Sequence, residues 1–239
     1  MDSVTLSGEE RATLDGLAAD LGRVFGARLR SVVAYGLETP MPPPRLLHTL
    51  ALVDRLSFND LTRCAPLAAG WHRRSLAVPL LLELDEFMRT LDVFPLEYGD
   101  IIAHHVLVAG SDPLTGARVT PVDVRRACEL SAKSHLIHLR EAFLETGGDS
   151  NAVGRLIAAS APAFTALLRN IARLADDHEP DVAASAERQI GIPSDVVREV
   201  VSAGAGTRSP IAEPTALLSR YIAASERVWE YVDTWREHA

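Results

Sequence analysis

The sequence predicts a chain of two parts, an α/β or α+β domain over residues 1–118 and an all-α helical bundle over residues 119–239. Up to about residue 110, short apolar runs rich in β-branched residues alternate with helical segments, which is typical of a sheet flanked by helices. Beyond Pro121, apolar residues recur at three- and four-residue spacing over long runs, which indicates antiparallel helices. A length of 239 residues, 47% of them hydrophobic, suffices for two cores of ordinary size.

The first helix is predicted from its start signal and its periodicity. Ser7 and Glu10 have capping-box spacing, in which a hydroxyl and a carboxylate bind free backbone N–H groups at a helix start. An apolar stripe continues to Phe25, and Gly26 is a suitable stop. We therefore expect a helix to about Phe25 with one buried stripe.

The following segment predicts strands separated by helices. The run 31–35 is apolar, β-branched and followed by Gly36, so it predicts a buried strand. Three consecutive prolines exclude helix or inner strand from 38–44, because each proline lacks a backbone donor. The remaining elements expected in this half are a strand over 47–53, a helix capped by Ser57 or Asn59 and running to Arg74, a strand over 77–82, a short helix over 85–90, and strands over 93–98 and 103–109.

Five helices are expected in the second half. Pro121 suits a first helical turn, and the long helix that follows ends at Gly147-Gly148. The next helix contains Pro162, which we expect to kink it or divide it in two. The expected helices cover 122–145, 150–176, 180–190, 194–202 and 214–235.

Composition restricts the class of partner. A net charge of −8 argues against nucleic acid as a partner, because such binding requires basic patches that release counterions. Cys64 and Cys128 lie far apart and outside any Cys/His cluster, so neither zinc nor a disulfide framework is expected. No segment has the uninterrupted apolar length of a membrane span, and the N-terminus lacks the pattern of a signal peptide. We expect a soluble, cytoplasmic protein with no membrane partner.

Four stretches give the chain a resemblance to a known family: Val32 to Gly36, Leu50 to Val53, Leu91 to Glu97 and Arg125 to Glu129. In this order of elements the chain resembles the nucleotidyltransferase superfamily, within it the aminoglycoside nucleotidyltransferases and related minimal enzymes. The resemblance implies a mixed sheet with flanking helices and a helical bundle after it. It also implies Gly-Ser after the first strand, two aspartates at i and i+2 on the second, and a third carboxylate on a later strand, which together hold metal ions and phosphates.

The sequence departs from that pattern where the chemistry would occur. Gly36 matches the family glycine, but Leu37 replaces the serine, and Leu47-His48-Thr49-Leu50-Ala51-Leu52 contains no carboxylate. Asp54 is the first carboxylate reached, and Glu97 is the candidate for the third position. Because magnesium sites use carboxylate oxygens, we expect no metal, no cofactor and no catalytic residue. The prediction is a degenerate relative, a binding or regulatory protein that retains an interdomain cleft, with Gly36, Asp54, Glu97, Asp100 and Arg125 as remnants of that cleft.

Two enzymatic alternatives stay open. The first is an active nucleotidyltransferase that uses Mg²⁺ and an NTP to transfer NMP to a small molecule or a protein. It would recruit Glu97, Asp100 and either Glu83 or Asp85, although Glu83 and Asp85 are more simply interpreted as charges at a helix start. The second is a ribonuclease of HEPN type, suggested by Arg173 and His178. In a chain with so many arginines, an arginine and a histidine at this spacing are expected by chance. The motif therefore carries little weight.

The histidines and aromatic residues have simpler interpretations. His104 and His105 are adjacent on an expected strand and face opposite sides, which favours a structural or surface role. His135 and His138 share a helix face without a third ligand and are expected on the surface. Tyr221, Trp229 and Val232 are expected to pack on the bundle or on a second subunit. None of these residues identifies a partner. We expect an unspecified small molecule or protein, and the sequence leaves homodimerisation open.

Overall fold

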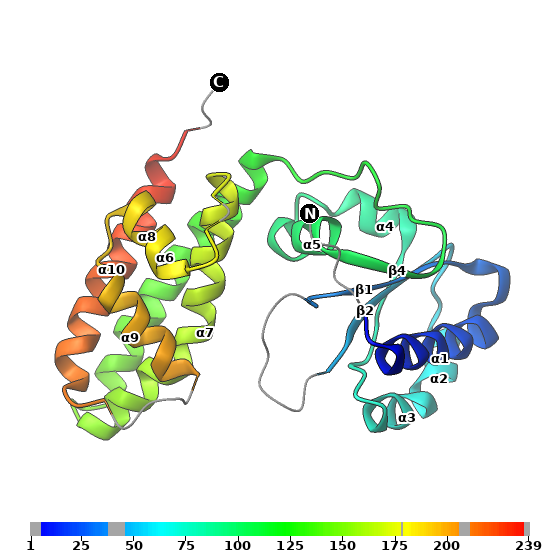
Figure 1. Ribbon diagram of the computed structural model, residues 1–239, viewed down its shortest axis with the longest axis horizontal. Helices are drawn as coiled ribbons and strands as arrows, with labels where there is room; N and C mark the ends of the chain where they lie inside the picture. Colours follow the sequence, from blue (N-terminus) through cyan, green and yellow to red (C-terminus); the bar gives the residue numbers. More distant parts are fainter. Residues whose placement is uncertain (1–5, 38–45, 178, 206–210, 237–239) are drawn as a thin grey trace. The chain divides into compact units, whose positions relative to one another are not determined.

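The computed structural model describes residues 6–37, 46–177, 179–205 and 211–236. The chain divides into two compact units, Met1–Val119 and Thr120–Ala239, each with buried apolar residues of its own (Figure 1). The first contains a four-stranded sheet with flanking helices, and the described part of the second is built from helices. The predicted fold class is confirmed.

The first unit contains the sheet and the helices around it. Its elements are α1 (Gly8–Phe25), η1 (Gly26–Arg28), β1 (Leu29–Tyr35), β2 (His48–Val53), α2 (Phe58–Cys64), η2 (Ala65–Leu67), α3 (Ala68–Arg73), β3 (Leu80–Glu83), α4 (Leu84–Arg89), α5 (Pro95–Ala103) and β4 (His105–Gly110). The capping box of Ser7 and Glu10 is present at the start of α1. Ser57 caps α2 in the same way, with Asp60 as its partner.

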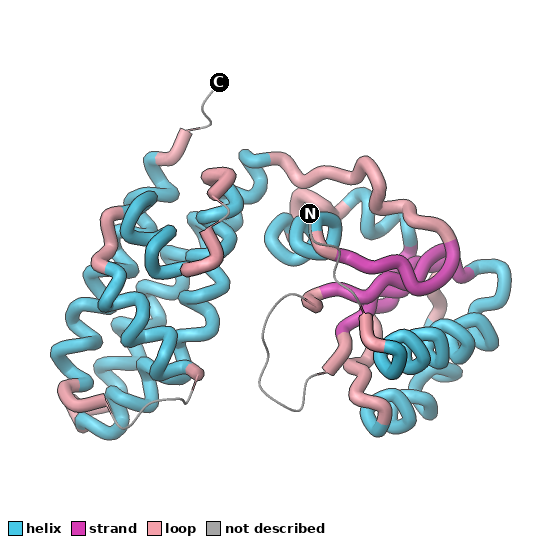
Figure 2. Tube along the Cα trace, in the orientation of Figure 1, coloured by secondary structure: helices cyan, strands magenta, loops and turns pink. Residues whose placement is uncertain are grey.

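The strands lie in the order β3-β2-β1-β4. β1 pairs antiparallel with β2 and with β4, whereas β2 and β3 are parallel, so the sheet is mixed. Helices cover both faces (Figure 2). On one face, β-strand residues pack with α1, α2 and α3 around Leu17 and Trp71. On the other face they pack with α4 and α5 around Phe87 and Ile101, and we call this second cluster the α5-side core.

One predicted strand is wrong. The segment 93–98 is a turn followed by α5, not a strand. Pro95 occupies the first helical turn, where its missing N–H costs nothing, and Tyr98 and Ile101 follow at three-residue intervals on the buried side. The predicted position of Glu97 on a strand is therefore also wrong, because Glu97 lies in the first turn of this helix.

Two other elements are shorter than predicted. The expected helix to Arg74 is interrupted by the 3₁₀ turn η2, which contains Pro66. The third strand begins only at Leu80, after Pro79, and ends at Glu83. The predicted proline-rich loop over 38–44 lies outside the described residues.

The second unit contains α6 (Pro121–Glu145), α7 (Ser150–Leu174), α8 (Val182–Ile190), α9 (Ser194–Gly204) and α10 (Pro214–Thr234). Pro162 does not divide α7, which is continuous over 25 residues. Next to this proline, α7 and α9 pack closely. A Cβ atom added to Gly204 of α9 would lie 2.6 Å from the Cβ atom of Ala161 on α7. Glycine at 204 therefore allows α9 to approach α7.

By length and composition alone, α7 is apolar enough to cross a membrane. Its buried side includes Ile157, Phe164 and Leu168, and it packs against α6, α9 and α10. This placement is typical of the core helix of a soluble protein.

Candidate functional site

No carboxylate lies on either face of the second strand, His48–Val53. Side chains alternate along a strand, so Leu50 and Leu52 enter the α5-side core while Ala51 and Val53 enter the other core. Each of these four residues is 0% exposed. From Leu50 to Val53, both faces of β2 are therefore filled by hydrocarbon, and the strand that the resemblance expects to carry paired aspartates has none.

Three polar aromatic residues instead form a row across the sheet at the end of β1. Tyr35 is directly opposite His48 of β2 and directly opposite His105 of β4. Opposed residues in antiparallel strands point to the same face with Cβ atoms about 4.5–5.5 Å apart. Tyr35 packs against the α5-side core, so the row lies on that face. Gly36 follows directly, with a φ of +68° that favours glycine.

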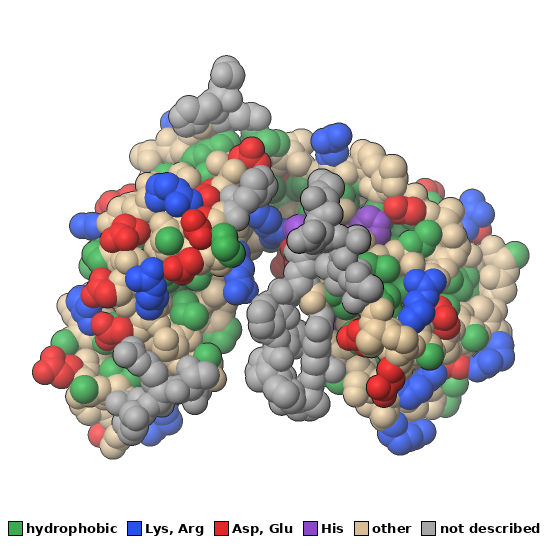
Figure 3. Space-filling view, in the orientation of Figure 1, with side chains coloured by type: hydrophobic (Ala, Val, Ile, Leu, Met, Phe, Trp, Pro, Cys, Tyr) green, Lys and Arg blue, Asp and Glu red, His purple; other side chains and the backbone are tan. Residues whose placement is uncertain are grey.

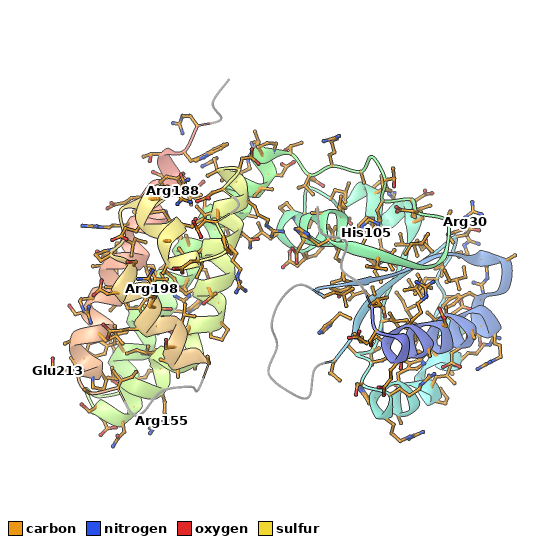
Figure 4. The ribbon with its side chains drawn as sticks, in the orientation of Figure 1. Arg30, His105, Arg155, Arg188, Arg198 and Glu213 are labelled. Carbon is orange, nitrogen blue, oxygen red and sulfur yellow. The ribbon has the colours of Figure 1, made fainter. Side chains whose placement is uncertain are left out.

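His105 is held by α5 and by the loop after β4. Its Nδ1 lies 3.1 Å from the carbonyl oxygens of Ile101 and Ile102, and its Nε2 lies 3.2 Å from an oxygen of Asp112. Figure 4 labels His105 in the unit that contains the sheet. Both ring nitrogens thus face acceptors, the backbone carbonyls at the carboxyl end of α5 and the carboxylate of Asp112 in the loop after β4. These contacts give His105 a structural role. The sequence analysis expected both histidines on a strand, but His104 is the C-cap residue of α5 and only His105 lies on β4.

Asp112 completes this structural contact. It also accepts hydrogen bonds from the Thr115 hydroxyl at 2.8 Å and from the backbone N–H of Leu114 at 2.9 Å. Desolvation raises the pKa of Asp112, but the hydrogen bonds from Thr115, Leu114 and His105 outweigh it and hold the pKa below its usual range. Asp112 is therefore a carboxylate at neutral pH, held by Thr115, Leu114 and His105.

Tyr35 and His48 differ from His105 because neither has a hydrogen bond to another described residue. Their ring centroids lie 5.9 Å apart at an interplanar angle of 42°, and both side chains are half-buried. Burial raises the pKa of the Tyr35 phenol, which keeps it protonated and able to donate. This Tyr35–His48 pair is the candidate site: two fixed rings with unused polar atoms beside the glycine turn.

Two of the predicted cleft remnants lie at opposite ends of the sheet. Gly36 follows Tyr35, whereas Asp54 follows Val53, which is opposite Leu29 at the start of β1. The six-residue step from Leu29 to Tyr35 corresponds to about 20 Å of strand. Asp54 is exposed and binds Arg30 at 2.9 Å. The structure therefore does not bring Asp54 to the glycine turn.

The other carboxylates also have separate positions. Glu97 is exposed, and Asp100 follows it by three residues along α5. Glu83 pairs in register with Val53, at the Asp54 end of the sheet, and accepts the backbone N–H of Leu56 at 2.8 Å. It also caps α4, while Asp85 lies in the first turn of that helix. Within the described ranges, no three His, Cys, Asp or Glu residues are arranged to hold a metal ion.

Arg125, the last predicted remnant, makes its hydrogen bonds inside the helical unit. Its guanidinium donates to Glu129 at 2.8 Å and to the carbonyl oxygen of Val232 at 3.2 Å. These contacts join the beginning of α6 to the end of α10. They give Arg125 a structural role in the bundle.

In the segment that suggested a ribonuclease, the acidic residue Asp177 has a structural role. His178 lies outside the described residues, and Arg173 binds Asn170 on its own helix. Asp177 accepts hydrogen bonds from Ser185 at 2.7 Å and Arg188 at 2.6 Å, which fixes the connection between α7 and α8. The described contacts of this segment are those of a helix connection.

One histidine prediction is wrong. His135 does not lie on the helix surface: it stacks on Phe164 and lies 2.8 Å from the Tyr221 hydroxyl. The signal was available, because His135 neighbours the buried stripe of Cys128, Ala132 and Leu136 on α6. His138 is exposed as predicted. Tyr221 and Val232 are buried within the bundle, and the Lys133 ammonium lies 3.6 Å from the centroid of the Trp229 ring.

Charges on the helical unit alternate in sign. Figure 3 shows basic and acidic side chains interleaved on the visible face of this unit. Arg198 binds Asp181 at 2.8 Å, and Arg220 binds Asp195 at 2.9 Å. The arginines named here are therefore neutralised by acidic neighbours.

Comparison with known proteins relates this chain to others by fold. No family model matches the chain, and no curated protein matches it. A solved structure does: a spectinomycin adenyltransferase, AAD(9) from Enterococcus faecialis, crystallised with ATP and spectinomycin. The two chains are 9% identical, with a TM-score of 0.54 over 91% of this chain and 98% of that one. The likeness shows a nucleotidyltransferase-like fold, which confirms the resemblance at that level.

Proposed function

We propose that this protein is a nucleotidyltransferase-like protein that has lost nucleotidyl transfer and acts as a binding or regulatory protein. The observation that carries the proposal is the composition of β2. Leu50 and Leu52, spaced i and i+2 on one face, are completely buried in a core. The fold is nucleotidyltransferase-like, while the strand that would bear the paired aspartates has no carboxylate and is buried core from Leu50 to Val53.

The chemistry explains why this loss is decisive. Nucleotidyl transfer needs divalent metal ions that activate the attacking group and neutralise the departing pyrophosphate. Magnesium takes oxygen ligands, mainly carboxylates, together with the phosphates of the substrate. Leucine side chains supply no ligand, and an ion cannot be desolvated among them without a large penalty.

The alternative of rearranged carboxylates has less support. Glu97 and Asp100 are near each other on one helix, but Glu83 is engaged with Leu56 at the other end of the sheet. Among the described residues, the two carboxylates on α5 have no third ligand grouped with them, which this alternative requires. Glu97 and Asp100 are nevertheless the pair to mutate if transfer is observed.

Calorimetry with Mg²⁺ and each common NTP, combined with an assay for AMP transfer to spectinomycin and to the protein itself, tests the proposal. We expect no transfer and no binding that depends on magnesium. Tight magnesium-dependent binding followed by transfer of AMP or phosphate would overturn the proposal. In that case the double variant Glu97→Gln/Asp100→Asn identifies the ligands: transfer lost with the fold retained assigns the reaction to the rearranged carboxylates.

A further inference from the structure

We infer that the Tyr35–His48 pair binds a planar heteroaromatic ring of the size of a nucleobase, without a divalent cation. The inference rests on the proposed function, since it assigns a ligand class to a site that performs no transfer. It places the ligand's ring, not a phosphate chain, beside the glycine turn.

The first argument is preorganisation. Tyr35 and His48 are opposed residues of β1 and β2, the two central strands, so the sheet ladder fixes their backbones. The rings lie 5.9 Å apart and 42° from coplanar, and each keeps part of its surface exposed. Two tilted rings held in this way present an apolar, polarisable wall on which a planar ligand can stack with little loss of side-chain entropy.

The second argument is hydrogen-bonding capacity. The phenol of Tyr35 can donate and accept one hydrogen bond each, and a neutral imidazole offers one donor and one acceptor. Within the described part of the chain, neither side chain uses these groups, whereas His105 in the same row has partners for both nitrogens. A heteroaromatic ring with donors and acceptors along its edge is complementary to such a pair.

The third argument is charge. Proteins usually bind phosphates through arginine, lysine, a metal ion or backbone amides at a helix start. Over the described ranges, neither ring of the pair has an ion pair or a cation above its face, and the neighbouring His105 ring is already engaged by Asp112. A phosphate chain would find little compensation here, so affinity should come from the ring.

The test is a titration of the full chain in EDTA with adenosine, guanosine, cytidine and uridine, and in parallel with ATP. The readouts are the side-chain NMR signals of Tyr35 and His48 and the dissociation constant. We expect at least one nucleoside to shift both signals saturably, and the nucleotide with the same base to bind no more tightly. His48→Leu and Tyr35→Leu should each weaken binding at least about fivefold, the lower end of what base stacking on an aromatic ring contributes.

Controls separate loss of the site from loss of the fold. Tyr35→Phe keeps the ring and should retain most of the affinity that Tyr35→Leu loses. His72→Leu removes an exposed imidazole from α3 in the same unit and should leave binding unchanged. Thermal unfolding by circular dichroism of each variant verifies that it is folded.

The outcomes distinguish this inference from the proposed function. If ATP binds in EDTA while adenosine does not, or if no nucleoside shifts the two signals, the ring-binding inference is wrong and the proposed loss of transfer still stands. If binding requires magnesium and AMP is transferred, both are wrong. Unchanged affinity in folded His48→Leu protein would also overturn the inference.

Discussion

The hydroxyl of Tyr221 lies 2.8 Å from Nε2 of His135 and joins α10 to α6 in the interior of the helical unit. Tyr221 is 0% exposed, and its burial raises the pKa of the phenol, so the hydroxyl is the donor and a neutral imidazole accepts. Phe164 of α7 stacks on the imidazole and meets the Tyr221 ring edge-on. Three helices thus meet at one neutral hydrogen bond.

We predict that this contact makes the helical unit sensitive to acid. Burial lowers the pKa of His135 in the folded chain, so the unfolded chain takes up the proton first. Stability is therefore fully present above the ordinary histidine pKa of about 6.5 and falls as pH drops from there to the folded-state pKa. Urea unfolding between pH 7.5 and pH 5 should show this loss.

The double variant His135→Leu/Tyr221→Phe supplies the control, because it removes both the titrating group and its partner. Its stability should vary less with pH over the same range than that of the natural chain. An equal pH dependence in both proteins would show that another group is responsible. His138→Leu, at an exposed position on the same helix, should leave the pH dependence unchanged.

We predict that Gly110→Ala destabilises the first unit. Gly110 has a φ of +83°, and a Cβ there would lie 2.1 Å from the carbonyl oxygen of Arg30, a backbone atom that cannot move aside easily. The loss should exceed about 1 kcal/mol, since the conformation disfavours alanine even without a clash. Gly22→Ala is the matched control: it is helical, it meets nothing within 4 Å, and it should stabilise by about 0.5–1 kcal/mol. If chemical denaturation showed the same change in the free energy of unfolding for Gly110→Ala and Gly22→Ala, the strain assigned to position 110 would be contradicted.

We predict that Thr49→Val stabilises the protein. Thr49 is 1% exposed on β2, and its hydroxyl has no hydrogen-bond partner among the residues that the structure describes. Valine has nearly the same shape, so the change removes an unsatisfied buried group whose desolvation costs about 1–3 kcal/mol. The free energy of unfolding should rise by about 1 kcal/mol or more. A decrease on urea unfolding would mean that the hydroxyl has a partner, such as a buried water molecule.

The sequence by itself determined the local features of this protein. The capping box at Ser7 depends on residues three positions apart, and the periodicity of α6 depends on neighbours along one helix. The absence of carboxylates between Leu47 and Leu52 is likewise a property of the chain alone. Such features can be predicted because the interacting groups are close in sequence.

Only the tertiary structure decided the features that depend on distant residues. Segment 93–98 contains apolar residues that suit a strand or a helix, and packing of Tyr98 and Ile101 in the α5-side core selected the helix. The position of Tyr35 between His48 and His105 depends on strand register, and the burial of His135 depends on α7 and α10. A one-residue change of register would turn every side chain of a strand to the other face, so the candidate site follows from long-range pairing, not from any local motif.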